Sequence, residues 1–469
     1  MSNSAIIWIV LPVVLGIGMA FIQRFRKLSA ILGTLFPLIF AVLALIFSNG
    51  LTLIFLGRAY TIADSLTVFG RTIQITADQL DIIALLYFLC FAWNLGSRLF
   101  SVSQWFTSLS LVITALWVSV QFINPFLYSA VVIELIALIS VPLLSPRGTP
   151  AQSGVLRFLS MQTLAMPLIL LSGWMVSGIE TSPSAEVLVL RGSLLVIAGF
   201  SLWAGIFPLH SWLPMLTEET HPWVISFLQT IMQIGIAIFF LKFLNQYAWL
   251  RNQEEIKLVL KWIGALCIIS GGILSFFQTK LSRIFGYLFL AGTGYIVLTM
   301  AFQQQGWIDL LTLHVLPRAF AYWSLGYSLS MLREALGSES LYISELKGLI
   351  WRYPRISTLL FISFLNILGM PLFSLFPSNR LIWSILARES LVIRLLISIG
   401  LVGMILMFLR VLSMAVQPAD VTEQDKQERP LMLVPVVLIV LIMVLAGLFP
   451  QFFSAPVQNL FISFHDLLP

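Results

Sequence analysis

The chain has 469 residues, of which 59% are hydrophobic and only 10% are charged, and its mean hydropathy is +0.99. Because soluble domains carry about 25% charged residues, this composition excludes a soluble globular protein and predicts an all-α protein that crosses a bilayer many times. The net charge of +6 does not indicate a nucleic-acid partner, because the basic residues lie in short loops between apolar runs and form no basic domain.

Apolar runs that can cross the ~30 Å hydrocarbon core follow one another along most of the sequence. We predict about fourteen spans, at residues 4–22, 29–48, 82–99, 104–122, 126–145, 154–177, 190–207, 223–244, 257–277, 284–303, 307–331, 356–384, 391–414 and 431–450.

The basic residues of the connecting loops indicate the topology. If the spans alternate, one side collects Arg24, Arg26, Lys27, Arg98, Arg147, Lys280, Arg283, Arg333, Lys347, Arg352 and Arg355. The positive-inside rule makes this side cytoplasmic and both termini non-cytoplasmic. Four arginines fall on the other side, so the charge is biased but not cleanly divided: Arg58, Arg71, Arg251 and Arg388.

Two segments lack the composition of a span. Residues 51–80 alternate apolar and polar side chains and contain Gly57 and Gly70, a pattern that predicts an extracellular β-hairpin. Residues 415–430 are strongly polar and predict a solvated loop.

Prolines and glycines interrupt two of the predicted spans. Pro208 and Pro214 break the seventh span, and Gly369, Pro371 and Pro377 break the twelfth. Non-helical backbone at membrane depth persists only where neighbouring helices or a polar cavity satisfy it, and two such breaks in comparable places indicate an ion pathway. Each break alone fits an ordinary proline kink equally well.

Three motifs resemble one family of membrane proteins. FPLHSWLPMLTEETHP (207–222) is similar to that family's FPLHxWLPDAHxxAPxP, and YISELKGLIWRYP (342–354) with LGMPLFSLFPSN (368–379) is similar to its D-L-x-x-L-x-G-L-x-x-x-x-P and AGIPPLAGFxxK. QTKLSRIFGYLFLAGTGYI (278–296) resembles Q-x-D/N-x-K-R-x-x-x-Y-S-S-x-x-H-x-G-Y. The family comprises the antiporter-like subunits L, M and N of respiratory complex I (NADH–quinone oxidoreductase) and the A- and D-type components of Mrp-type cation/proton antiporters.

The resemblance implies two inverted five-helix repeats, with broken helices 7 and 12. We expect N-terminal helices in 1–122, repeats in 123–250 and 251–415, and a cytoplasmic loop with a C-terminal helix in 416–469. The chain ends soon after its last predicted span, without the long lateral helix of the L-type members, so an M-, N- or D-like member is expected.

The family carries a polar axis of lysine, glutamate and histidine through the membrane, and this chain keeps part of it. Glu134 falls on the family's fifth-helix glutamate and stands among apolar residues, where a carboxylate normally faces a partner or a cavity. A carboxylate tied to a neighbouring helix without a proton role is the alternative. We expect Arg157 or another basic group near Glu134.

His314 and Arg318, in LHVLPRAFAYW, match T-H-A-x-x-K-A. His314 has a near-neutral reference pKa and is the group in this region that can exchange protons, although a structural histidine is almost as good an interpretation. Arg380 follows the twelfth-helix break as an anchor or counter-charge, because arginine stays protonated.

Four family positions on the axis are degenerate in this chain. They are Trp203 and Asn379 in place of lysines, Gln233 in place of a lysine or histidine, and Gly292 in place of a histidine. These replacements put full proton pumping in question.

The loop motif of Pro208, His210, Trp212 and Pro214 does not predict a metal site, because the neighbouring carboxylates and imidazoles lack a ligand spacing. The two cysteines, Cys90 and Cys267, lie in apolar runs, and no nucleotide, haem or flavin motif is present. We therefore expect no cofactor and no redox chemistry in this chain.

The sequence favours an ion-translocating subunit of a complex-I-like assembly that moves protons or Na⁺ with other membrane subunits as partners, in a bacterial inner or another energy-transducing membrane. A D-like component of a multisubunit Mrp-type Na⁺/H⁺ antiporter and a non-conducting structural subunit remain as alternatives.

Overall fold

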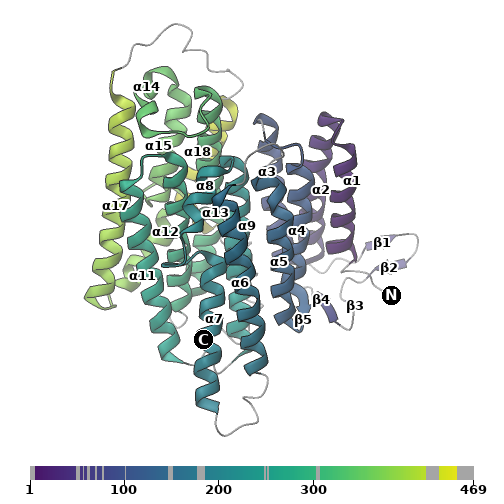
Figure 1. Cartoon of the computed structure of the whole chain (residues 1–469). Coiled ribbons are helices and arrows are strands. Elements are labelled where there is room, and N and C mark those ends of the chain that lie inside the picture. Colours follow the sequence, from purple (N-terminus) through teal and green to yellow (C-terminus); the bar gives the residue numbers. More distant parts are fainter. Residues whose placement is uncertain are drawn as a thin grey trace. The chain divides into compact units, whose positions relative to one another are not determined.

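The computed structural model describes residues 6–48, 53–55, 58–60, 64–68, 71–75, 79–100, 102–145, 152–176, 185–247, 250, 253–302, 307–418 and 433–451. Most of them are helical, and the long helices run beside one another within each part of the chain (Figure 1). The N-terminal helices are η1 (Ile6–Val10), α1 (Leu11–Ile22), α2 (Arg26–Ser48), α3 (Leu80–Gly96), α4 (Phe106–Phe122) and α5 (Ser129–Leu144). The next are α6 (Ser153–Val176), α7 (Ala185–Ala204), α8 (Trp212–Glu219) and α9 (Pro222–Gln246).

The second half of the chain continues the helical pattern. Its helices are α11 (Glu254–Phe277), α12 (Leu281–Ala301), α13 (Trp307–Leu336), α14 (Leu349–Arg352), α15 (Pro354–Ile367), α16 (Phe376–Leu386), α17 (Leu391–Val416) and α18 (Leu433–Leu448). Short 3₁₀ segments also lie between helices in the described residues: η3 (Ser97–Leu99), η4 (Phe126–Tyr128) and η6 (Ile343–Leu346).

The strands follow α2, where the sequence predicts a hairpin. Strand β1 (Leu53–Phe55) pairs antiparallel with β2 (Arg58–Tyr60), and β3 (Asp64–Val68) pairs antiparallel with β4 (Arg71–Ile75). The short β5 (Ile123–Asn124) adds to β4. The segment therefore forms two hairpins where we expected one.

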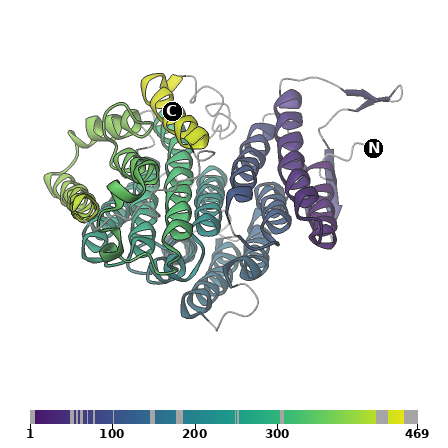
Figure 2. The same cartoon turned by 90° about the horizontal axis from the view of Figure 1, so that it is seen from above.

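The chain forms two compact units. Unit 1 contains Met1–Ala204 and Phe227–Asn252, and unit 2 contains Gly205–Ser226 and Gln253–Gln458. In unit 2, α11 packs against α12 and α17, and α13 packs against α15; Figure 2 views these helices end-on.

Glycines set the close approach of α11 and α17. A Cβ at Gly272 would overlap the backbone oxygen of Gly400, so neither helix can carry a larger residue at this crossing. Small residues at a crossing are the usual way in which membrane helices pack closely.

Seven of the described helices are long and apolar enough to cross a membrane, and further apolar helices of 10–17 residues accompany them. Several also expose large apolar side chains, such as Phe21 (85%) and Leu391 (61%), as expected of a surface that faces lipid. This is an integral membrane protein. The total of fourteen spans stays a prediction. The twelfth (356–384) consists of two helices, α15 and α16, separated by residues 368–375, where the sequence predicts an interruption.

Candidate functional site

The break between α15 and α16 is held together by one amide side chain. Asn366 Oδ1 accepts hydrogen bonds from Ser374 Oγ at 3.0 Å and from the backbone N–H of Leu375 at 3.2 Å. Gly369, with φ of +72°, supplies the left-handed turn that a residue with a Cβ rarely adopts. Part of the freed backbone is thus satisfied inside the protein, as an interrupted helix in a membrane requires.

His314, on α13, lies beside this break and is fully buried. Its Nε2 accepts from Arg318 Nη2 at 2.9 Å and Nε at 3.2 Å, and its Nδ1 lies 3.2 Å from Ser378 Oγ on α16. A guanidinium can only donate, so the arrangement requires an unprotonated Nε2 and assigns the ring proton to Nδ1. Ser378 Oγ can then accept from His314 and donate to the carbonyl of Leu375 at 3.1 Å.

Arg318 is a buried cation, with 2% of its surface exposed. Its guanidinium carbon lies 5.2 Å from the ring centre of Tyr295 and 5.9 Å from that of Tyr322. Within the described part of the chain, no carboxylate lies within salt-bridge distance of it. Cation–π contacts and one imidazole therefore stabilise a charge that would otherwise be costly in hydrocarbon. We call His314, Arg318, Ser378, Tyr295 and Tyr322 the histidine cluster.

The histidine cluster accounts for two of the degenerate axis positions. A Cβ at Gly292, on α12, would overlap the hydroxyl of Tyr322, so tyrosine occupies the space that a histidine side chain would need. Asn379 follows Ser378 and is buried, with its Nδ2 against Gly369. Arg380 is exposed and does not join the histidine cluster.

In unit 1, Glu134 on α5 faces a neighbouring helix, as expected. Its Oε1 accepts a hydrogen bond of 2.6 Å from Thr163 Oγ1 on α6, whereas its Oε2 is buried without a partner among the described residues. The expected contact with Arg157 is wrong. Arg157 is exposed on α6, and no ion pair joins the two side chains in the described structure.

Trp203, on α7, belongs to a buried aromatic cluster. The ring of Phe200 lies 5.6 Å from that of Trp203 and 4.9 Å from that of Phe240 on α9. The Trp203 indole N–H is buried without a described partner. Gln233, also on α9, is 7% exposed. This part of unit 1 offers aromatic surface and an amide, neither of which exchanges a proton near neutral pH.

The loop motif leads into α8, which docks on α12. His210 is mostly buried and stacks on Phe207 at 5.4 Å between ring centres, and burial lowers its pKa below the usual value. A Cβ at Gly286 on α12 would lie 2.6 Å from the Cα of Pro214, which shows how closely the two helices approach. The indole of Trp212, at the start of α8, packs against Gly205 in the segment that precedes the helix.

An ionic clasp fixes the end of α8. Glu218 accepts from Lys280 Nζ at 2.6 Å and also binds Arg283 Nε. Burial alone would raise the pKa of Glu218, but the hydrogen bonds from Lys280 and Arg283 outweigh it and lower the pKa. We call Glu218, Lys280 and Arg283 the ionic clasp.

Sequence reasoning missed several of these groups. From the sequence, Lys280 and Arg283 serve only to predict the topology, and their ion pairs with Glu218 are not predicted. The motif at the break between α15 and α16 identifies Asn379 as a site residue but not its neighbour Ser378. Lys242, near the end of α9, lies with its ammonium 5.3 Å from the ring centre of Phe122.

Comparison with known proteins gives consistent results. A family described as "NADH:quinone oxidoreductase/Mrp antiporter, TM" matches residues 151–406. NADH-quinone oxidoreductase subunit N of Methylococcus capsulatus is 27% identical over 276 residues, which are 56% of this chain and 54% of that protein. The match thus spans about half the length of this relative.

Three solved assemblies contain chains of the same fold. A chain of an archaeal membrane-bound sulfane sulfur reductase has a TM-score of 0.79 at 16% identity, over 99% of this chain and 97% of that chain. A chain of the Mrp complex from a Dietzia species has a TM-score of 0.76 at 14% identity, over 100% of both chains. A chain of respiratory complex I from Thermus thermophilus has a TM-score of 0.74 at 20% identity, also over 100% of both.

Proposed function

The chain belongs to the NADH:quinone oxidoreductase/Mrp antiporter family of membrane proteins, and from this membership we propose that it is an ion-translocating subunit of a complex-I-like assembly. Its transported ion is the proton, and its partners are other membrane subunits. The relative from Methylococcus capsulatus, which belongs to NADH-quinone oxidoreductase, supports this assignment.

The observation that carries the proposal is the buried contact of Arg318 with His314. While Arg318 donates to Nε2, the imidazole is neutral and its proton lies on Nδ1, toward Ser378. When the guanidinium moves away, Nε2 can accept a proton, and Nδ1 can release its own to Ser378 Oγ while Ser378 gives its hydroxyl proton to a water molecule. One proton enters and one leaves, so the imidazole is again neutral but carries its proton on Nε2. The ring must return to the Nδ1-protonated tautomer before it can accept from Arg318 again.

Conduction in unit 1 is reduced under this proposal. Glu134 keeps its hydrogen bond to Thr163, but Trp203 and its aromatic neighbours provide no group that exchanges a proton. Glu134 is then a positioning group between α5 and α6, and Arg157 and Arg380, both exposed, lie apart from the route. The main route runs through unit 2.

Two other functions have support from particular observations. The full-length fold match to a chain of the Mrp complex favours a D-like component of a cation/proton antiporter. The aromatic cluster around Trp203 favours a non-conducting structural subunit, because it closes part of the family axis. In each case the chain lies in a bacterial inner or similar energy-transducing membrane with both termini non-cytoplasmic, and performs no redox chemistry itself.

Substitution of Arg318 tests the proposal against the structural alternative. We expect Arg318→Gln to abolish most of the pH gradient formed by vesicles that contain the assembled complex, because the cation that sets the protonation of His314 is lost. Arg380→Gln is the matched control, since it removes an exposed arginine from the neighbourhood of the same break. Assembly of each variant is checked by native gel. Wild-type gradients with Arg318→Gln in a fully assembled complex would favour the structural subunit.

A further inference from the structure

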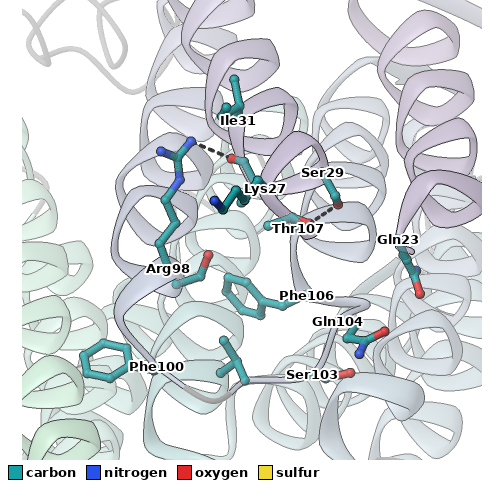
Figure 3. A pocket seen from close by; sticks show the side chains of 13 residues that line it. Gln23, Lys27, Ser29, Ile31, Arg98, Phe100, Ser103, Gln104, Phe106 and Thr107 are labelled. Carbon is teal, nitrogen blue, oxygen red and sulfur yellow. Dashed lines mark hydrogen bonds between the residues drawn. The ribbon is translucent and has the colours of Figure 1, made fainter. Parts of the chain in front are cut away.

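Unit 1 contains a pocket of about 450 Å³ that the proposed route does not use. It lies where α1 turns into α2 and where α3 leads through η3 into α4, and Figure 3 shows the side chains that line it. Both connections lie at the end of these helices away from the strands, since the strands join the other ends of α2 and α3. Its polar lining includes Gln23, Lys27, Ser29, Arg98, Gln104 and Thr107.

The pocket is positively charged. Lys27 and Arg98 supply two cations, and the sequence contains no Asp or Glu in residues 1–63 or 82–133. In the described structure neither cation forms an ion pair. The charge is therefore available to an anion from outside the chain.

Hydrogen bonds within the chain fix several polar side chains of the pocket in position to bind a hydrogen-bond acceptor. Arg98 Nη2 donates to the carbonyl of Ala30 at 2.8 Å, a bond drawn in Figure 3. It also donates to Thr34 Oγ1 at 2.7 Å, so α2 fixes the guanidinium. Ser29 and Thr107 bond each other at 3.3 Å across the pocket wall. Gln23 Nε2 is buried without a partner among the described residues, which leaves one amide donor for a ligand.

Two helices also begin at the pocket. Lys27 and Ser29 lie in the first turn of α2, and Phe106 and Thr107 lie in the first turn of α4. The positive ends of both helix dipoles add to the charge of the side chains, and helix N-termini favour phosphate groups.

An exposed apolar stripe starts at the same place. Leu28, Ile31 and Leu35 are 45%, 50% and 44% exposed along one face of α2, and Ile31 itself lines the pocket. Leu95 and Leu99, at 50% and 46%, expose the end of α3 and η3 beside Arg98. A cationic pocket that continues into apolar helix surface suits an anion that carries a hydrocarbon tail.

We propose that this pocket binds the headgroup of an anionic glycerophospholipid, with the phosphate between Lys27 and Arg98 and an acyl chain along the stripe of α2. Basic pockets between membrane helices on the cytoplasmic side bind such headgroups through charge and hydrogen bonds. The lipid joins the two helix pairs of the N-terminal region, α1–α2 and α3–α4, at the membrane surface.

Native mass spectrometry of the full-length chain tests the proposal, with phosphatidylglycerol, phosphatidylcholine and inorganic phosphate as probes. We expect one phosphatidylglycerol to be retained in preference to phosphatidylcholine. Lys27→Gln should weaken its binding roughly fivefold, the usual effect of one basic side chain near an anionic lipid. Lys27→Arg should restore it, and Lys347→Gln, which removes an exposed cation elsewhere, should leave it unchanged.

Three results would overturn the proposal. They are equal retention of phosphatidylglycerol by wild type and Lys27→Gln, equal binding of the two lipids, and displacement of phosphatidylglycerol by millimolar phosphate, which would assign the site to a free anion. If Lys27→Gln does not fold, Gln104→Glu places a carboxylate in the same pocket from an exposed position and is expected to weaken binding likewise. Lipid retention is measured without transport, so its outcome is independent of the proposed proton route.

Discussion

At the scale of single residues, Gly292 and Tyr322 show how one neighbour changes what a position can hold. The hydroxyl of Tyr322 lies 3.4 Å from the carbonyl of Leu288, and a Cβ at Gly292 would overlap that hydroxyl. The absence of a side chain at Gly292 therefore leaves room for the Tyr322 hydroxyl against α12. Gly292 thus has a packing role of its own, in addition to the absence of the histidine that the family resemblance leads us to expect there.

Gly292→Ala tests this packing. We expect the variant to lose about 1–3 kcal/mol of stability, the usual effect of overfilling a packed interior. Tyr322→Phe should restore part of the loss in the double variant, because it removes the clashing oxygen. The midpoint of thermal unfolding in detergent measures both effects. An unchanged midpoint for Gly292→Ala would show that the two side chains are not packed as described.

Local sequence spacing predicted the residues of the histidine cluster only in part. His314 and Arg318 are four residues apart, which places them on one face of a helix, and the structure brings them into contact. Ser378 and Tyr295 could not be identified in this way, because their nearness depends on how α16 and α12 approach α13. The Arg157 prediction failed for the same reason: proximity to Glu134 depends on the rotation of α6, which an apolar sequence leaves undetermined.

At the scale of elements, the break between α15 and α16 depends on Asn366. Its replacement by alanine leaves the hydroxyl of Ser374 and the backbone N–H of Leu375 without their acceptor. We expect Asn366→Ala to lose about 1–3 kcal/mol, the usual effect of an unsatisfied buried donor. Ser384→Ala on exposed α16 surface is the matched control. Equal thermal midpoints for the two variants would contradict the role of Asn366.

The ionic clasp makes the docking of α8 sensitive to pH. The pKa of Glu218 is lowered in the folded protein from its usual 4.5, so the clasp is fully stabilising above that value and is lost as the pH falls through and below it. The rate of limited proteolysis of the 205–221 segment should rise on acidification over this range. Glu218→Gln should raise the rate at neutral pH and flatten its pH dependence. A wild-type rate that does not change with pH would contradict the prediction.

The elements themselves were largely predictable, whereas their irregular parts were not. The length of the apolar runs predicted most of the long helices, and the prolines and glycines predicted both interruptions. Short elements such as α8 and η6 escaped prediction, because a segment of four to eight residues carries little periodicity. The ionic clasp escaped it too, since α8 and α12 are joined only by tertiary packing.

At the scale of the whole molecule, the charge bias of the loops predicts the orientation in the membrane. We expect cysteines introduced at Ser2 and Glu345 to react with an impermeant reagent from opposite faces, Ser2 from the non-cytoplasmic and Glu345 from the cytoplasmic side. The measurement compares labelling of intact cells with labelling of inverted vesicles. Labelling of both sites from the same face would contradict the proposed topology.

The proposed function depends most on how transport is divided between the two units. Unit 2 contains a buried imidazole with a hydroxyl beside it, whereas the Glu134 carboxylate of unit 1 is bonded to Thr163 and forms no ion pair among the described residues. The direct measurement is pH-gradient formation by vesicles that carry the assembled complex with His314→Ala or Glu134→Gln. We expect His314→Ala to lower the rate roughly a hundredfold, as removal of a positioned proton-transfer group does, and Glu134→Gln to lower it only modestly. A complete loss with Glu134→Gln and a near-wild-type rate with His314→Ala would contradict this division.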